Sequence, residues 1–137
     1  MFNKMQIPSV VGGIDKQVLT PPTNAQSTAA TDANPFYING DFSKVKMLYA
    51  DGNYSTNGGY QYFGAGIIDD IVLGQTYKVK LGQYSTDASC YFVRNITVYA
   101  DKIKIGSCLR TLDGGSTWVT TYVGQNYANI NHLYVYG

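Results

Sequence analysis

The chain has 137 residues, a formal net charge of +1 and nine acidic residues, all of them Asp. This charge gives no global field that would gather nucleic acid or an anionic membrane, and no apolar run approaches the roughly 20 residues of a membrane-spanning helix. With 13 Tyr and 15 Gly, and with Val, Ile and Thr frequent, the composition predicts a single all-β domain, either a β-sandwich or a jelly roll.

The first 35 residues differ from the rest of the chain. All four prolines lie at positions 8, 21, 22 and 35, and "TPPTNAQSTAATDANP" has no apolar residue larger than Ala. Such a stretch cannot offset its ordering entropy by burial, so residues 1–35 are predicted to be an extended N-terminal arm and spacer, and residues 36–137 the folded domain.

The arm begins with a set of apolar residues that could hold it on another protein. An extended segment with such anchors can add to a neighbour's sheet edge or lie in a groove. The predicted anchors are Phe2, Met5, Ile7, Val10 and Val11. Ile14, Val18 and Leu19 are candidates for a second anchor.

From residue 36 onward, short runs of strand-forming residues alternate with turn residues. The predicted strands are 36–39, 44–50, 60–65, 67–73, 76–82, 90–100, 102–110, 117–123 and 131–136. "AGIIDDIVLG" is the one place where a helical turn competes, and its β-branched residues argue against it.

Three of these strands share a Lys-apolar-Lys pattern, which places two lysines on one face of the strand. The pattern occurs at residues 44–46, 78–80 and 102–104. One interpretation is protection of sheet edges and solubility. The other is that the lysines gather on one face opposite an acidic partner.

The stretch "DGNYSTNGG" spaces Asp51, Asn53, Ser55 and Asn57 as oxygen ligands of calcium are spaced. Only one of them is a carboxylate, and Asp-Gly and Asn-Gly favour turns, so residues 51–58 are predicted to form a turn. A weak ion site is the alternative. No cofactor is predicted.

Catalytic motifs give no positive indication. His132 is the only histidine, and no GxSxG, GxGxxG or GxxxxGK[ST] sequence occurs. An enzyme would need a pocket that joins His132 to an Asp, and we predict that the chain is not an enzyme. Cys90 and Cys108 match no redox or zinc spacing and are expected to be reduced, with a disulfide as the alternative.

The last predicted strand, "HLYVYG", alternates Leu133 and Val135 with His132, Tyr134 and Tyr136. Three ring-bearing residues on one face would form an apolar patch that a soluble monomer seldom leaves exposed. We therefore predict self-association through His132, Tyr134 and Tyr136, most simply as a trimer. The alternative use of such aromatic residues is a sugar-stacking face.

The anchoring arm "MFNKMQIPSVVGGIDKQVLTPPTN", followed by a compact Glu-free domain rich in Gly and Tyr, resembles small structural proteins of tailed-phage virions, of the capsid-decoration or head-fibre kind. The resemblance implies a non-enzymatic protein of the capsid surface. It also implies a β-sandwich or jelly roll, often trimeric, attached by its N-terminus to the major capsid protein or another virion protein. A carbohydrate-binding or receptor-binding module is the rival hypothesis.

Overall fold

The computed structural model describes residues 10–11, 14–55, 61–84, 86–120 and 127–137. In this part of the chain it contains ten strands and one helix. They are β2 (Val10–Val11), β3 (Ile14–Leu19), α1 (Asn24–Ala29), β4 (Phe36–Asn39), β5 (Met47–Ser55), β6 (Gln61–Ile68), β7 (Thr76–Tyr84), β8 (Asp87–Val98), β9 (Lys102–Thr111), β10 (Val119–Thr120) and β11 (Tyr127–Tyr136). The predicted all-β class is confirmed. No helix in the described part is long and apolar enough to cross a bilayer.

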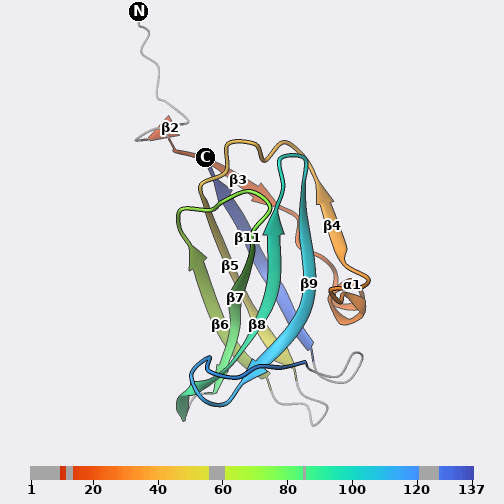
Figure 1. The fold of residues 1–137 in the computed structure, drawn as a ribbon, viewed down its shortest axis with the longest axis vertical. Helices are drawn as coiled ribbons and strands as arrows, with labels where there is room; N and C mark the ends of the chain where they lie inside the picture. The colour runs from red at the N-terminus through yellow and green to blue at the C-terminus, as the bar shows by residue number, and fades with distance from the viewer. Residues whose placement is uncertain (1–9, 12–13, 56–60, 85, 121–126) are drawn as a thin grey trace, which may run out of the picture.

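The strands form two sheets that pack as a β-sandwich (Figure 1). The first sheet has the order β2-β3-β11-β5-β6, and the second has β10-β9-β8-β7 with β4 also paired to β9. All pairings are antiparallel. Alternate residues of each strand point between the sheets, and the largest buried apolar side chains include Phe42, Leu48, Leu81, Phe92, Ile96, Ile103, Ile105 and Leu133.

Glycines allow the two sheets to meet closely along one side of the sandwich. A Cβ atom on Gly64 of β6 would lie 2.8 Å from the backbone nitrogen of Gly82 in β7, and one on Gly66 would lie 2.8 Å from that of Lys80. The "GAG" of β6 is therefore required by the approach of two main chains.

Several predicted strand limits were wrong for local reasons. Residues 69–75 form a loop in place of the predicted strand 67–73, because Asp70 adopts a positive φ of 53° that ends β6. β5 begins at Met47, so Lys44 and Lys46 lie in the preceding loop. β10 covers only Val119–Thr120 of the predicted strand 117–123, and residues 121–126 lie outside the described part.

The prediction that residues 20–35 cannot pack was also wrong. Thr23 and Gln26 form a capping box at the start of α1, in which each side chain bonds to the other residue's backbone N–H. Ser27 and Ala30 are buried. The segment crosses from β3 in the first sheet to β4 in the second, so residues 14–35 belong to the sandwich. The folded unit therefore begins before the predicted boundary at residue 35.

Arg94 of β8 holds this crossing segment in place. Arg94 is 1% exposed, and its guanidinium donates to the backbone carbonyls of Ser27 (2.9 Å), Ala30 (3.2 Å), Gly106 (2.8 Å) and Ala128 (2.7 and 3.1 Å). Burial lowers the pKa of Arg94 from its ordinary value. A single side chain thus ties α1 to both sheets, which the strand pattern of "YFVRNITV" does not predict.

Candidate functional site

The outer face of the first sheet carries the residues predicted for self-association. Leu133 and Val135 are buried in the core, so His132, Tyr134 and Tyr136 point outward on β11. β11 is not at the edge of the sheet: it lies between β3 and β5. Any contact through these residues is therefore face to face and cannot be strand addition to β11.

Four apolar residues line up across this face, one from each strand. Tyr134 is paired with Val18 of β3 on one side and with Tyr49 of β5 on the other, and Tyr49 is paired with Ile67 of β6. We call Val18, Tyr134, Tyr49 and Ile67 the apolar row. Its two ends are open to solvent, with Val18 70% and Ile67 60% exposed, and both tyrosines are half-buried.

Both faces of the Tyr134 ring are covered within the chain. The Tyr49 ring stacks on it with centroids 5.5 Å apart and an interplanar angle of 17°. The ammonium nitrogen of Lys16, from the strand on the opposite side, lies 4.2 Å from the ring centroid. The aromatic ring of Tyr134 therefore has no free face for stacking on a sugar.

A short chain of hydrogen bonds adjoins the apolar row. Nδ1 of His132 lies 2.7 Å from Oδ1 of Asp51, which is the facing residue on β5. The hydroxyl of Tyr49 donates to Oδ2 of the same carboxylate at 2.7 Å. This bond stabilises the protonated phenol and raises the pKa of Tyr49 above its ordinary value.

The structure thus joins His132 to an aspartate, which is the pairing that an enzyme would need. The pair lies on the open face, with 58% of the His132 side chain and 28% of the Asp51 side chain exposed. Among the described residues, no hydroxyl or thiol is hydrogen-bonded to the other ring nitrogen of His132. What the arrangement provides is a polar, hydrogen-bonding border beside the apolar row.

The residues predicted as anchors divide into two groups. Phe2, Met5 and Ile7 lie outside the described residues. Val10 and Val11 form β2, whose backbone pairs with Ile14 and Asp15 of β3. The described part therefore places the beginning of the chain at the β3 edge of the first sheet.

The predicted turn at 51–58 is wrong for its first half. Residues 51–55 continue β5, where they pair with β6 and β11. Residues 56–58 lie outside the described part. A Cβ atom on Gly52 would lie 1.8 Å from the carbonyl oxygen of Asn129, so this glycine permits the close approach of β5 to β11 where their register shifts.

No group of three or more metal-ligating His, Cys, Asp or Glu side chains occurs within the described ranges. Cys90 and Cys108 are both buried, and no disulfide joins them in the described part of the chain. Cys90 lies 3.4 Å from a carboxylate oxygen of Asp87, and burial is the main cause of its raised pKa.

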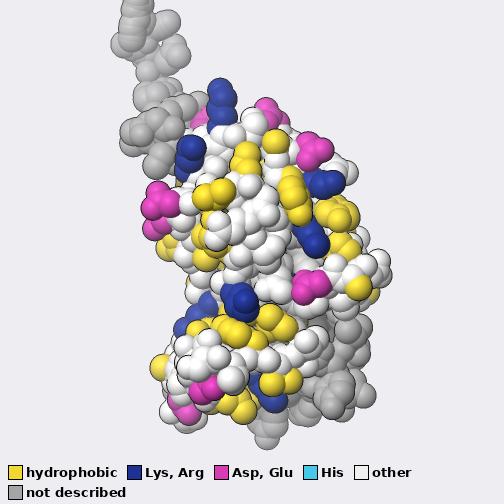
Figure 2. Space-filling view, viewed as in Figure 1, with side chains coloured by type: hydrophobic (Ala, Val, Ile, Leu, Met, Phe, Trp, Pro, Cys, Tyr) yellow, Lys and Arg dark blue, Asp and Glu magenta, His cyan; other side chains and the backbone are white. Residues whose placement is uncertain are grey.

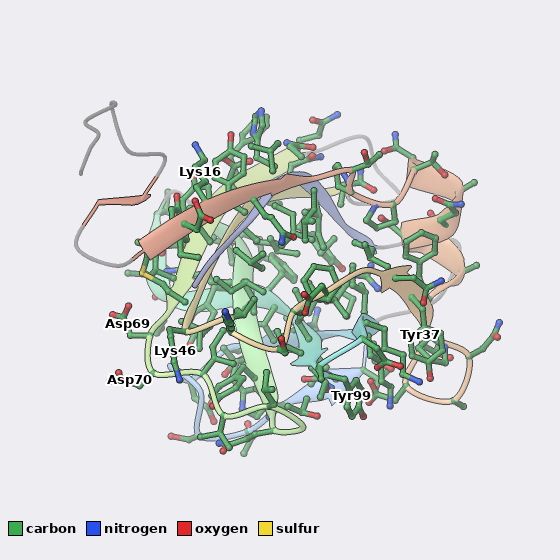
Figure 3. All side chains as sticks on the ribbon, turned by 90° about the horizontal axis from the view of Figure 1, so that it is seen from above. Lys16, Tyr37, Lys46, Asp69, Asp70 and Tyr99 are labelled. Carbon is green, nitrogen blue, oxygen red and sulfur yellow. The ribbon has the colours of Figure 1, made fainter. Side chains whose placement is uncertain are left out.

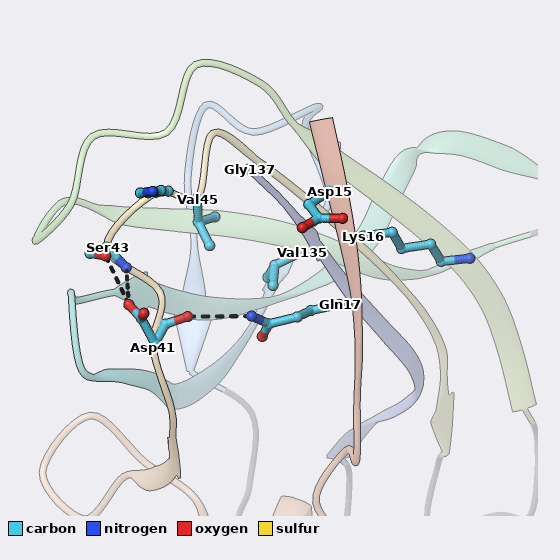
Figure 4. A pocket seen from close by; sticks show the side chains of 9 residues that line it. Asp15, Lys16, Gln17, Asp41, Ser43, Val45, Val135 and Gly137 are labelled. Carbon is cyan, nitrogen blue, oxygen red and sulfur yellow. Dashed lines mark hydrogen bonds between the residues drawn. The ribbon is translucent and has the colours of Figure 1, made fainter. Parts of the chain in front are cut away.

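A cavity of about 200 Å³ lies near the C-terminus of the chain, between β3 and the loop before β5 (Figure 4). Three of its polar residues, Gln17, Asp41 and Ser43, are hydrogen-bonded to one another. The Asp41 carboxylate accepts from the backbone N–H and the hydroxyl of Ser43, which lowers the Asp41 pKa, and the Gln17 amide donates to the Asp41 carbonyl. These bonds connect β3 to the β4–β5 loop.

A more open groove of about 520 Å³ runs along the close contact of β6 and β7. The ring of Phe63 is 66% exposed at this groove, and the side chains of Gln61, Gln83 and Lys80 supply amide and ammonium groups around it. An exposed ring beside hydrogen-bonding groups is a combination that can bind a saccharide.

Val18, Tyr49, Asp51 and Ile67 were not predicted from the sequence to lie on the outer face of the first sheet. Their alternation was visible within each strand, but only the register between strands places them beside Tyr134 and His132. Comparisons of the chain with protein-family models, with curated proteins and with solved structures find no match.

Proposed function

We propose that the chain is a non-enzymatic structural protein of the surface of a tailed-phage head, as a head decoration or head fibre. In this proposal the N-terminal arm attaches it to the major capsid protein or to another virion protein. The resemblance of the whole chain to such proteins supports the proposal, together with one observation in the fold.

That observation is the position of β3. On its outer side β3 pairs with β2 at Ile14 and Asp15, and in the described part of the chain no strand pairs with the rest of that side. Phe2, Met5 and Ile7 precede β2 in the sequence, so the predicted anchors lie close in the chain to this open part of the edge. An open edge can accept a strand from a partner protein, and apolar residues beside it can strengthen such a contact.

Immunoelectron microscopy of purified virions from the source of this sequence tests the proposal. We expect antibody against the chain to label the head surface. Purified heads that lack the protein should bind the full chain, and should bind a chain without residues 1–9 at least about tenfold more weakly, because the anchors Phe2, Met5 and Ile7 are missing. Virions that carry no label while the chain is present in infected cells would refute the proposal.

The second candidate is a carbohydrate-binding or receptor-binding module, which the β6–β7 groove favours. A glycan array probed with the full chain tests it, and Phe63→Ala should abolish any binding at this groove. Tyr134→Ala is the matched control, because the structure leaves that ring no free face. Binding that survives Phe63→Ala would place the sugar elsewhere.

A further inference from the structure

Four of the eight lysines lie on the outer face of the second sheet. Lys78 and Lys80 come from β7, and Lys102 and Lys104 come from β9. Their intervening residues, Val79 and Ile103, are buried in the core, which sets both pairs outward. We call these four residues the lysine face. The other Lys-apolar-Lys pair, Lys44 and Lys46, lies elsewhere, in the loop before β5.

Three of these lysines are held over aromatic rings. The ammonium group of Lys78 lies 5.5 Å from the ring centroid of Trp118, and that of Lys80 lies 4.8 Å from that of Tyr91. Lys102 lies 5.1 Å from the Tyr37 ring and 5.6 Å from the Tyr99 ring, two residues that occupy the same corner of the molecule (Figure 3). These contacts restrict the lysine side chains before any partner arrives, which reduces the entropy lost on binding.

The positive charge of this face is not neutralised within the described part of the chain. The ion pair found among the described residues joins His132 to Asp51 on the first sheet. None of the four ammonium groups of the lysine face has a carboxylate within 4.0 Å in that part of the chain. The acidic residue beside Lys104 is Asp32, and its carboxylate already accepts from the backbone N–H of Ser107 and from the Asn95 amide. Figure 2 shows Lys and Arg side chains spread over the visible side of the molecule, with acidic side chains near its ends and also near its middle.

Neutral hydrogen-bonding groups occupy the surface between the lysines. Thr76 and Asn95 line a depression of about 240 Å³ together with Lys104 and Asp32, and the buried Thr97 lies beneath them with its hydroxyl 2.6 Å from that of Thr76. The Asp32 carboxylate is already bonded to donors of this chain, whereas the ammonium group of Lys104 can pair with a carboxylate of a partner.

We propose that the lysine face binds an acidic surface of a partner protein, with the lysines opposite Asp or Glu carboxylates. The positive charge of the lysine face favours an anionic partner. Two observations favour a protein over a nucleic acid as that partner. The rings on this face already carry ammonium groups, whereas single-stranded nucleic acid needs ring faces on which bases stack. The chain has a pI of about 7.7, whereas nucleic-acid-binding domains are strongly basic. The proposal holds whether or not the chain is a virion protein.

Binding of the full chain to fluorescein-labelled poly-aspartate, measured by fluorescence anisotropy at low salt, tests the proposal. The triple variant Lys78→Gln, Lys102→Gln and Lys104→Gln should weaken binding by about tenfold or more. The triple variant Lys16→Gln, Lys44→Gln and Lys46→Gln has the same net charge and should bind within about twofold of the unchanged protein. Replacing the three face lysines by Arg should preserve binding, because the charge is kept.

Three results would overturn the proposal. In the first, the two triple variants lose equal affinity, so that only net charge matters. In the second, poly-aspartate does not bind at low salt. In the third, a DNA oligonucleotide of equal charge binds at least about tenfold more tightly than poly-aspartate and depends on the same lysines, which assigns the face to nucleic acid.

Discussion

At the scale of single residues, Arg94 has the environment that departs most from a simple strand pattern. It occupies an inward position of β8, and its donors are satisfied by main-chain carbonyls from α1, the residue after α1, β9 and β11. A buried guanidinium costs desolvation energy, and these bonds offset that cost. The same bonds make the position of the N-terminal segment depend on one side chain of the second sheet.

We expect Arg94→Met to lower the free energy of unfolding by about 2–4 kcal/mol, because four buried carbonyls lose their hydrogen-bond donor. The loss is partly offset because a charged group no longer has to be buried. Urea unfolding followed by tyrosine and tryptophan fluorescence measures the change. Arg110→Met is the control: this side chain is half-buried, and we expect a loss under about 1 kcal/mol. Equal losses in the two variants would contradict the role given to Arg94.

At the scale of elements, β3 and α1 convert the N-terminal region from a spacer into part of the sandwich. β3 pairs with β11 over Leu133–Tyr136, and the segment after it reaches the second sheet through α1. The same elements define how the N-terminus can be shortened without unfolding the domain.

A chain that begins at Ile14 should unfold at nearly the same temperature as the full chain. A chain that begins at residue 31 should lose most of its stability, because it lacks β3 and leaves Arg94 with only the carbonyls of Gly106 and Ala128. We expect the midpoint temperature of thermal unfolding of this shorter chain to fall by at least about 10 °C, measured by circular dichroism during heating. Equal midpoints for the two shortened chains would mean that residues 14–30 do not belong to the folded unit.

At the scale of the whole molecule, the two sheets present chemically different outer faces. The first sheet carries the apolar row beside the His132–Asp51 pair, and the second carries the lysine face. Both faces are exposed in the described part of a single chain. Contiguous exposed apolar residues are characteristic of protein contact surfaces, and we propose that the apolar row mediates contact between copies of this chain.

We expect the full chain to be a trimer at micromolar concentration, measured by light scattering. Val18→Asp with Ile67→Asp should convert it to a monomer, because both ends of the apolar row would then carry charge into the contact. Val72→Asp with Val119→Asp is the matched control: these side chains are 59% and 55% exposed elsewhere, and the oligomer should persist. A monomeric unchanged chain, or dissociation by the control pair, would contradict this assignment.

Local sequence patterns were enough to predict the all-β class and most of the strands beyond residue 75. Alternation such as that of "KVK" in β7 and "KIK" in β9 is local information, because successive side chains of a strand point to opposite faces whatever lies beside it. The outward direction of His132, Tyr134 and Tyr136 followed from the same rule.

Which strands lie side by side, and therefore which residues share a face, could not be predicted from these local patterns. Strand register brought Val18, Tyr49 and Ile67 to Tyr134 from positions far apart in the chain. Polar Ser27 and small Ala30 became buried because Arg94 supplies hydrogen bonds to their carbonyls. Composition could not predict that burial, since the ordering entropy of residues 20–35 is offset by contacts with the sandwich and not by apolar side chains of their own.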